Sequence, residues 1–248
     1  MSLKKKFIFI SKNNNYFNKL SIGYSKRRSG CNFSGKKTVR FRGFINKKNK
    51  RVIDYFRSFW NFKAVILNFE YDPKRNTLIN LVVYFNGLFS YILSVESSFV
   101  GMTIWSGFNI LPIKGNCIII KNIPKYTKIC CVENSIKSGF KIARSSGSFA
   151  KIVKKSNSYC FLKLNSKKIK KVSLYCATTL GSILNFNFYL KRYKKAGFSR
   201  IKGFKPSVRG VAMNPVDHPH GGGEGKKSKL KSPKSPWGLS LNFVKKKV

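Results

Sequence analysis

The sequence of 248 residues contains very little negative charge. Only 7 residues are Asp or Glu, against 51 Lys and Arg, which gives a net charge of +44 at neutral pH. Because so many cations repel one another in a compact fold, the composition predicts a polyanionic partner. The cations are spread along the whole chain instead of gathering beside one apolar segment. This distribution favours RNA or DNA over a membrane surface.

Long apolar runs and paired cysteine motifs are also missing. No window of about 18 apolar residues occurs, and the apolar run at residues 7–10 is shorter than a signal peptide needs. We therefore expect neither a membrane span nor secretion. The 6 cysteines show no CxxC spacing, so they are expected to be reduced and partly buried, in a reducing compartment.

The chain nevertheless has enough apolar residues for folded cores, because 42% of its residues are hydrophobic and 15% are aromatic. Strand-like runs at residues 64–71, 77–85 and 88–95 are separated by the turns Asp72–Asn76 and Asn86–Gly87, which predicts three consecutive antiparallel strands. Their number and spacing indicate a small barrel of the OB type. The other runs assigned to this region are residues 51–56, 104–113 and 117–123.

A second series of short strands follows, separated by turns rich in Ser, Asn and Gly. Their spacing indicates a second barrel, closer to an SH3-like fold than to an immunoglobulin sandwich. The predicted fold is therefore mainly β, with an OB-like barrel followed by an SH3-like barrel. The strands of the second barrel are expected at residues 128–133, 148–154, 159–164, 168–174 and 178–184.

These patterns divide the chain into four segments. A short basic helix is predicted at residues 187–196, ended by Gly197, and no regular element is expected after it. The first segment mixes basic and aromatic residues and is expected to be an extended arm that its partner orders. The segments are a basic N-terminal arm at 1–38, the OB-like barrel at 39–115, the SH3-like barrel at 116–186 and an extended C-terminal segment at 187–248.

The stretch 208–225 differs from the basic sequence on both sides of it. It reads VRGVAMNPVDHPHGGGEG and contains both histidines of the chain and three consecutive glycines. Pro215 and Pro219 remove backbone donors, while Gly221–Gly223 permit backbone angles that side chains forbid. The stretch is therefore predicted to be an irregular loop, nearly neutral within a dense positive field.

Three functions can be assigned to this loop from its residues. Asp217 beside His218, with His220 nearby, could act as an acid/base pair, although the loop has no Ser or Cys nucleophile. The two histidines could bind a metal, but no Cys or third His follows at ligand spacing. We favour the third, in which the glycine amides approach phosphates and the imidazoles stack on or hydrogen-bond to RNA bases.

The loop, together with Pro236-Trp237-Gly238, resembles the signature of protein two of the large ribosomal subunit, in its bacterial and organellar form. The similarity covers roughly residues 36–239. It implies two barrels bound to large-subunit rRNA, with terminal segments that extend toward the peptidyl transferase region and the bridge to the small subunit. Further landmarks of the family are matched, in order, by residues 67–75, 122–124, 143–147 and 177–181.

From the resemblance we expect a structural constituent of an organellar large subunit, without catalytic residues or a protein-bound metal. The expected partners are large-subunit rRNA, other large-subunit proteins and the small subunit at a bridge, but no membrane. We expect no cofactor, with Mg²⁺ entering only through the rRNA. The abundance of residues with AT-rich codons favours an organellar or a symbiont gene. We expect the mitochondrion as the location, with the plastid as the alternative. The alternative function is an RNA-processing or maturation enzyme that uses Asp217 and His218.

The residues expected to contact RNA are basic, aromatic or part of a tight turn. For Trp237, packing against protein is the alternative to stacking on a base. The expected RNA-binding residues are Arg144, Ser146, Arg200, Lys202, Lys205, Arg209, Asn214, His218, His220, Gly221, Gly222, Gly223, Lys226 and Trp237.

Overall fold

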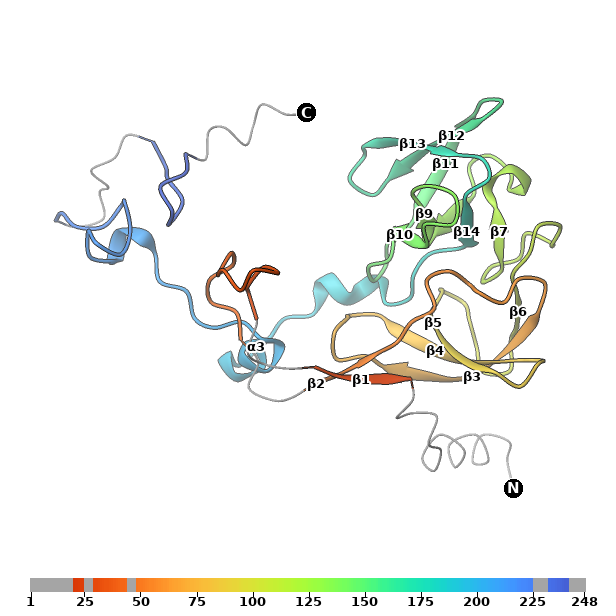
Figure 1. The fold of residues 1–248 in the computed structure, drawn as a ribbon, viewed down its shortest axis with the longest axis horizontal. Coiled ribbons are helices and arrows are strands. Elements are labelled where there is room, and N and C mark those ends of the chain that lie inside the picture. Colours follow the sequence, from red (N-terminus) through yellow and green to blue (C-terminus); the bar gives the residue numbers. More distant parts are fainter. Residues whose placement is uncertain (1–19, 25–28, 44–47, 225–231, 241–248) are drawn as a thin grey trace, which may run out of the picture. The chain divides into compact units, whose positions relative to one another are not determined.

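The computed structural model of the protein describes residues 20–24, 29–43, 48–224 and 232–240. The chain divides into two compact units (Figure 1). The first unit comprises residues 1–25 and 47–192 and holds the β-sheets, and the second comprises residues 26–46 and 193–248. No helix in the described ranges has the length and apolar character that crossing a membrane requires.

The first barrel is built on a four-stranded antiparallel sheet in the order β5-β4-β3-β6 (Figure 1). The pairing of Ile66 with Val82 and of Asn68 with Leu81 leaves one extra residue in β3, and this bulge bends the strand so that the sheet curls. The three predicted consecutive strands are confirmed. The strands are β3 (Lys63–Tyr71), β4 (Leu78–Tyr84), β5 (Phe89–Leu93) and β6 (Thr103–Trp105).

The second barrel is built on a six-stranded antiparallel sheet in the order β13-β12-β11-β8-β14-β7. Fully buried side chains such as Ile129, Ile152 and Leu162 form its core. Its strands are β7 (Cys117–Ile119), β8 (Lys128–Cys130), β11 (Ala150–Lys155), β12 (Tyr159–Leu164), β13 (Ile169–Ser173) and β14 (Ala177–Leu180). A two-stranded sheet of β9 (Val132–Glu133) and β10 (Phe140–Ile142) accompanies them. The predicted order of an OB-like and then an SH3-like barrel is confirmed.

The two barrels share a hydrophobic cluster. Tyr91 and Leu93 of β5 pack in it with Cys130 and Phe140 of the second barrel, and Val95 forms a β-bridge with Ile183. A common apolar core removes more surface from water than either barrel could bury alone, which explains why the first unit contains both.

The cysteines agree with the prediction of reduced, buried thiols. All six are free and five are buried, with Cys31 partly exposed. Burial raises the pKa of the Cys117 thiol to about 12, because the surrounding core disfavours the thiolate. These side chains therefore act as small apolar core residues.

Several predicted strands are shorter in the structure. The run 104–113 contains only β6, because the side-chain oxygen of Asn116 accepts the N–H of Trp105 and ends the regular pairing. The run 117–123 splits into β7 and the 3₁₀ helix η1 (Ile120–Asn122). In the run 51–56 only Arg51, the end of β2, lies in a strand, and Ile53 forms an isolated bridge with Tyr91. The rest of the run is a turn, because the carboxylate of Asp54 accepts backbone N–H groups that follow it.

The described parts of the predicted N-terminal arm are not simply extended. β1 (Ser21–Tyr24) pairs antiparallel with β2 (Lys48–Arg51), and a bridge between Cys31 and Lys37 closes a second turn. Backbone hydrogen bonds within the chain therefore order these two stretches. Residues 1–19 and 25–28 lie outside the described residues.

The prediction of a helix at residues 187–196 was wrong. The structure has a 3₁₀ helix, η2 (Phe186–Leu190), then α3 (Ala196–Lys202), and later a third 3₁₀ helix, η3 (Gly210–Ala212). α3 ends at Gly203, which has the left-handed φ of 96° and donates its N–H to the carbonyls of Arg200 and Ser199. Gly203 is therefore the helix terminator, while Gly197 lies in the first turn, where its N–H needs no partner within the helix.

Candidate nucleic-acid interface

Residues 210–224, called the histidine loop below, are held by hydrogen bonds within the chain. The carbonyl oxygen of Asn214 accepts the N–H of Asp217 at 3.0 Å. The carbonyl oxygen of Met213 accepts the N–H of Gly222 at 3.2 Å and so joins the two sides of the loop. The loop thus has a defined backbone path, although it contains neither a strand nor an α-helix.

Both imidazoles accept hydrogen bonds from the backbone. His218 is only 8% exposed, and its Nδ1 accepts the N–H of His220 at 3.0 Å. The Nε2 of His220 accepts the N–H of Lys234 at 2.8 Å, which ties the loop to the tail that follows. A ring nitrogen that accepts a hydrogen bond carries no proton, so each bond fixes the tautomer of its ring. The centroids of the two rings lie 4.9 Å apart, and the ring planes make an angle of 64°, nearly edge to face.

The glycines of the loop allow this close packing. A Cβ added at Gly210 would lie 2.5 Å from the ring of His218, and one at Gly221 would lie 2.2 Å from the carbonyl oxygen of Asn214. Gly222 and Gly223 have φ angles of 77° and 95°, which side chains rarely permit. Only glycine fits Gly210 and Gly221 without a shift of the loop.

The arrangement of the loop does not build an acid/base pair. Asp217 is exposed, and within the described residues no hydrogen bond or ion pair joins its carboxylate to His218 or His220. The Nδ1 of His218, which a carboxylate would have to orient, is engaged by the backbone instead. No group of three His, Cys, Asp or Glu side chains gathers in the part of the chain that the structure describes, so that part shows no metal centre.

The basic residues before the loop are positioned by α3 and by its contact with residues 41–43. Arg200 and Lys202 lie in the last turn of α3. Lys205 donates its backbone N–H to the carbonyl of Phe41 at 2.9 Å, and its side chain passes so close to Gly43 that a Cβ there would lie 2.8 Å from its Cε. Arg209 is exposed. The structure thus places a run of partly or fully exposed cations before the histidine loop.

Trp237 lies in a tight turn after the loop. The N–H of Ser235 donates to the carbonyl of Leu239 at 2.7 Å, and Gly238 at the turn has a φ of 81°. Trp237 is 56% exposed, so the turn presents its ring to solvent and leaves it open for stacking. The predicted contact Lys226 lies outside the described residues.

Arg144 and Ser146 belong to the first compact unit, whereas the other predicted residues belong to the second. The guanidinium of Arg144 lies 4.9 Å from the ring centre of Tyr55, and Arg75 donates to the hydroxyl of Tyr55 at 3.0 Å. Arg75 also pairs with the buried carboxylate of Asp72 at 2.6 Å. Two guanidinium groups therefore meet at one tyrosine, on residues that come from both barrels.

The sequence did not indicate that Arg75 and Tyr55 lie beside Arg144. The turn that contains Arg75 was recognised, but residues 55, 75 and 144 are far apart in the sequence and no spacing rule joins them. Arg144 was predicted from its place at the turn Ser145-Ser146-Gly147. Arg75 also lies in a polar turn, and that signal was not used.

Comparison with known proteins gives matches to two domain families and to a bacterial protein. Residues 18–106 match the sequence pattern described as "Ribosomal Proteins L2, RNA binding N-terminal domain", and residues 113–238 match "Ribosomal Proteins L2, C-terminal domain". The chain is also similar to the large ribosomal subunit protein uL2 of Buchnera aphidicola subsp. Cinara cedri (strain Cc). The two are 45% identical over 220 residues, which cover 88% of this chain and 80% of the relative.

Proposed function

The chain belongs to the ribosomal protein L2 family, and from this premise we propose that its histidine loop is shaped to fit into folded rRNA. Membership makes the protein a structural component of the large ribosomal subunit that binds rRNA and neighbouring ribosomal proteins. We further propose that its terminal segments support the peptidyl transferase region and the association of the two subunits.

One observation supports this role of the histidine loop more than any other. The acceptor nitrogens of both histidines are engaged by backbone N–H groups of the protein itself, at 3.0 Å and 2.8 Å. The imidazoles therefore stabilise the shape of the loop, and the surface left for RNA is largely backbone, glycine and the flanking cations. The N–H of Gly222 donates to the carbonyl of Met213, whereas the N–H of Gly223, a residue with left-handed φ, has no partner among the described residues and suits a phosphate oxygen.

The flanking residues have distinct roles in this proposal. Arg200, Lys202, Lys205 and Arg209 neutralise phosphates and set the register of the loop on the RNA. Trp237 stacks on a base, in keeping with its exposed ring. Arg144 binds phosphate from the first compact unit, with Arg75 beside it at Tyr55.

The protein is proposed to have no catalytic turnover of its own. An RNA-processing enzyme that used Asp217 and His218 would need the carboxylate to face the imidazole, and no such contact is found in the described loop. We expect no cofactor beyond Mg²⁺ that the rRNA brings with its phosphates.

We propose the mitochondrial ribosome as the location, with the plastid ribosome as the alternative. The similarity to a bacterial protein fits an organelle of bacterial descent, and the excess of residues with AT-rich codons points the same way. Immunodetection in purified mitochondria and plastids tests the assignment, and recovery from the plastid fraction alone would contradict it.

Sedimentation of large subunits tests the proposed function. We expect the chain at one copy per large subunit across the subunit peak of a sucrose gradient. Recovery only in fractions of immature subunits would favour a maturation factor instead. In binding assays with isolated rRNA, the logarithm of affinity should fall with the logarithm of salt by about 0.7 to 0.9 per neutralised phosphate. A flat response would contradict phosphate binding by the spread cations.

A further inference from the structure

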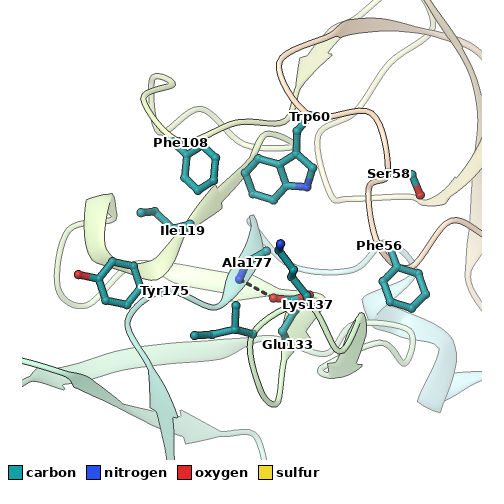
Figure 2. Close-up of a pocket in the computed structure, with 10 residues that line it drawn as sticks. Phe56, Ser58, Trp60, Phe108, Ile119, Glu133, Lys137, Tyr175 and Ala177 are labelled. Atoms are coloured by element: carbon teal, nitrogen blue, oxygen red, sulfur yellow. Dashed lines mark hydrogen bonds between the residues drawn. The ribbon is translucent and has the colours of Figure 1, made fainter.

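A pocket of about 390 Å³ lies in the first compact unit, lined by residues of both barrels (Figure 2). Its volume is within the range of about 300 to 1,000 Å³ that small-ligand sites occupy. Four lining residues are aromatic. Phe56, Trp60 and Phe108 come from the segments of the first barrel, and Tyr175 comes from the loop between β13 and β14 of the second.

The aromatic rings expose apolar area that the fold itself does not use. Trp60 is partly buried and packs on both barrel cores, and Figure 2 shows its ring next to that of Phe108, at a centroid distance of 5.0 Å. Phe108 and Tyr175 are 56% and 53% exposed. Exposed rings grouped around a pocket are typical of binding sites, because a protein without a partner normally buries its large apolar side chains.

The pocket also contains a buried carboxylate. Glu133 is 4% exposed. One of its oxygens accepts the N–H of Gly139 at 3.1 Å, and the other accepts the N–H of Ala177 at 3.0 Å (Figure 2). A carboxylate has about four acceptor sites, so these two bonds leave acceptor capacity for a donor that enters the pocket. It is the single acidic side chain among the lining residues.

One cation lines the pocket and a second lies against one of its aromatic rings. Lys137 lines the pocket and is exposed, and the ammonium of Lys121 lies 5.5 Å from the ring centre of Tyr175. An occupant with an apolar planar body, an N–H donor and a negatively charged connection would satisfy the rings, the carboxylate and the lysines together. An aliphatic side chain of another protein would satisfy only the rings.

We propose that this pocket holds one unpaired nucleobase of the rRNA. The base stacks on Trp60 and Phe108, its amino group donates to Glu133, and its neighbouring phosphates pair with Lys121 and Lys137. Stacking on aromatic rings combined with hydrogen bonds to a base edge is a general mode of single-stranded RNA recognition. The inference rests on the rRNA binding of the proposed function and adds a site to it.

The carboxylate selects the class of base. Adenine, cytosine and guanine carry an exocyclic amino group that can donate to Glu133. Uracil lacks this group, and its one ring donor is flanked by carbonyl oxygens that would face the carboxylate. The occupant is therefore a base with an amino group.

The first test is ultraviolet crosslinking of assembled large subunits that contain the full chain, read by mass spectrometry. We expect a crosslink from Trp60, Phe108 or Tyr175 to one nucleotide that carries an amino group. A crosslink to uridine would overturn the base selection. A crosslink to another ribosomal protein, or crosslinks elsewhere in the chain with none at these rings, would overturn the pocket as an RNA site.

The second test compares variants by chemical probing of the crosslinked nucleotide and by rRNA affinity. The double variant Phe108→Ala with Tyr175→Ala removes two exposed rings and should lower affinity about tenfold, since one stacked base contributes about 1 to 3 kcal/mol. In this variant the crosslinked nucleotide should become more reactive toward the chemical probe. Tyr126→Ala, which removes a ring that is 73% exposed outside the pocket, is the matched control and should change neither readout.

Lys137→Gln keeps the proposal testable if the aromatic variant folds poorly, because this lysine is exposed. It should make the salt dependence of binding shallower by about one phosphate. Unchanged protection of the base and an unchanged salt slope would overturn the proposal. Absence of rRNA binding by the unaltered chain would instead refute the proposed function itself.

Discussion

The barrels and the histidine loop reach a defined conformation by opposite means. The barrels bury Ile, Leu and Val side chains almost completely, as in the cluster that contains Ile129, Ile152 and Leu162. The histidine loop buries a single imidazole, that of His218, and relies on glycines that let backbone and ring approach closely. Burial of apolar area stabilises the barrels without a partner, whereas the loop has few such contacts to offset the entropy of ordering its glycines.

This difference separates the parts of the protein that anchor it from the part that is shaped for RNA. A barrel tolerates changes on its surface and is sensitive to changes in its core. The loop has almost no core, so it is sensitive to single atoms added to its backbone. The predictions below test whether stability and RNA binding separate in this way.

The largest expected effect concerns a barrel core. Leu162 is fully buried, so Leu162→Ala should lower the free energy of unfolding by about 2 to 5 kcal/mol, through lost burial and the cavity left behind. Chemical denaturation measures this loss. Lys163→Ala, at an exposed neighbour on the same strand, should change the free energy by less than about 0.5 kcal/mol. Equal effects would contradict the assignment of the core.

The second prediction concerns the backbone of the loop. Gly221→Ala places a Cβ 2.2 Å from the carbonyl oxygen of Asn214, so the backbone must shift. We expect rRNA affinity to fall at least about tenfold, which corresponds to about 1.4 kcal/mol, with barrel unfolding unchanged. Gly197→Ala is the control, because nothing lies within 4 Å of its added Cβ. Normal rRNA affinity of Gly221→Ala would show that the loop shape is not needed.

The third prediction concerns the hydrogen bond at His218. His218→Ala leaves the N–H of His220 without its acceptor, at a cost of about 1 to 3 kcal/mol when the group stays buried. His218→Asn retains an acceptor oxygen near the position of Nδ1 and should restore most of the loss. The fraction of large subunits that contain the protein measures the loss in His218→Ala and its recovery in His218→Asn. Assembled subunits with His218→Asn should still make peptide bonds, and fully assembled but inactive subunits would favour the catalytic alternative.

The last prediction concerns the buried thiol of Cys117, whose effect is absent at neutral pH and appears only at alkaline pH. Burial raises the pKa of Cys117 from 9.0 to about 12, so the unfolded chain releases this proton at lower pH than the folded chain. Stability should therefore be unaffected below pH 9 and fall between pH 9 and 12, by at most about 1.4 kcal/mol per pH unit for one thiol. Cys117→Ala should reduce this slope in thermal unfolding. An unchanged slope would contradict burial of the thiol.

The barrels were predictable because their information is local. The turn Asp72–Asn76 and the Asn86–Gly87 turn join runs of β-branched and aromatic residues, and the structure has strands between them as predicted. Strand ends were less predictable, since β6 stops where a side chain eleven residues later, Asn116, accepts the N–H of Trp105. No periodic pattern in the sequence reports such a contact.

The candidate site was predictable as a loop but not as a geometry. Three glycines and two prolines predicted an irregular segment, and the two histidines within it predicted imidazoles that contact RNA. The bonds from His220 to His218 and from Lys234 to His220 engage one nitrogen of each ring within the chain, and the ring of His218 packs closely on Gly210, which the sequence does not reveal. The aromatic pocket was missed for a similar reason, because Trp60, Phe108 and Tyr175 meet only through the packing of the two barrels.

Hydrogen exchange of the full chain, free and bound to large-subunit rRNA, tests the central claim most directly. The account predicts that amides of β3, β4, β11 and β12 exchange slowly in both states. The amides of His220, Gly221 and Gly222, which donate within the histidine loop, should exchange faster than the barrel amides in the free protein and should become slower in the complex. Loop amides that exchange equally in both states would contradict the claim that rRNA completes the order of the loop.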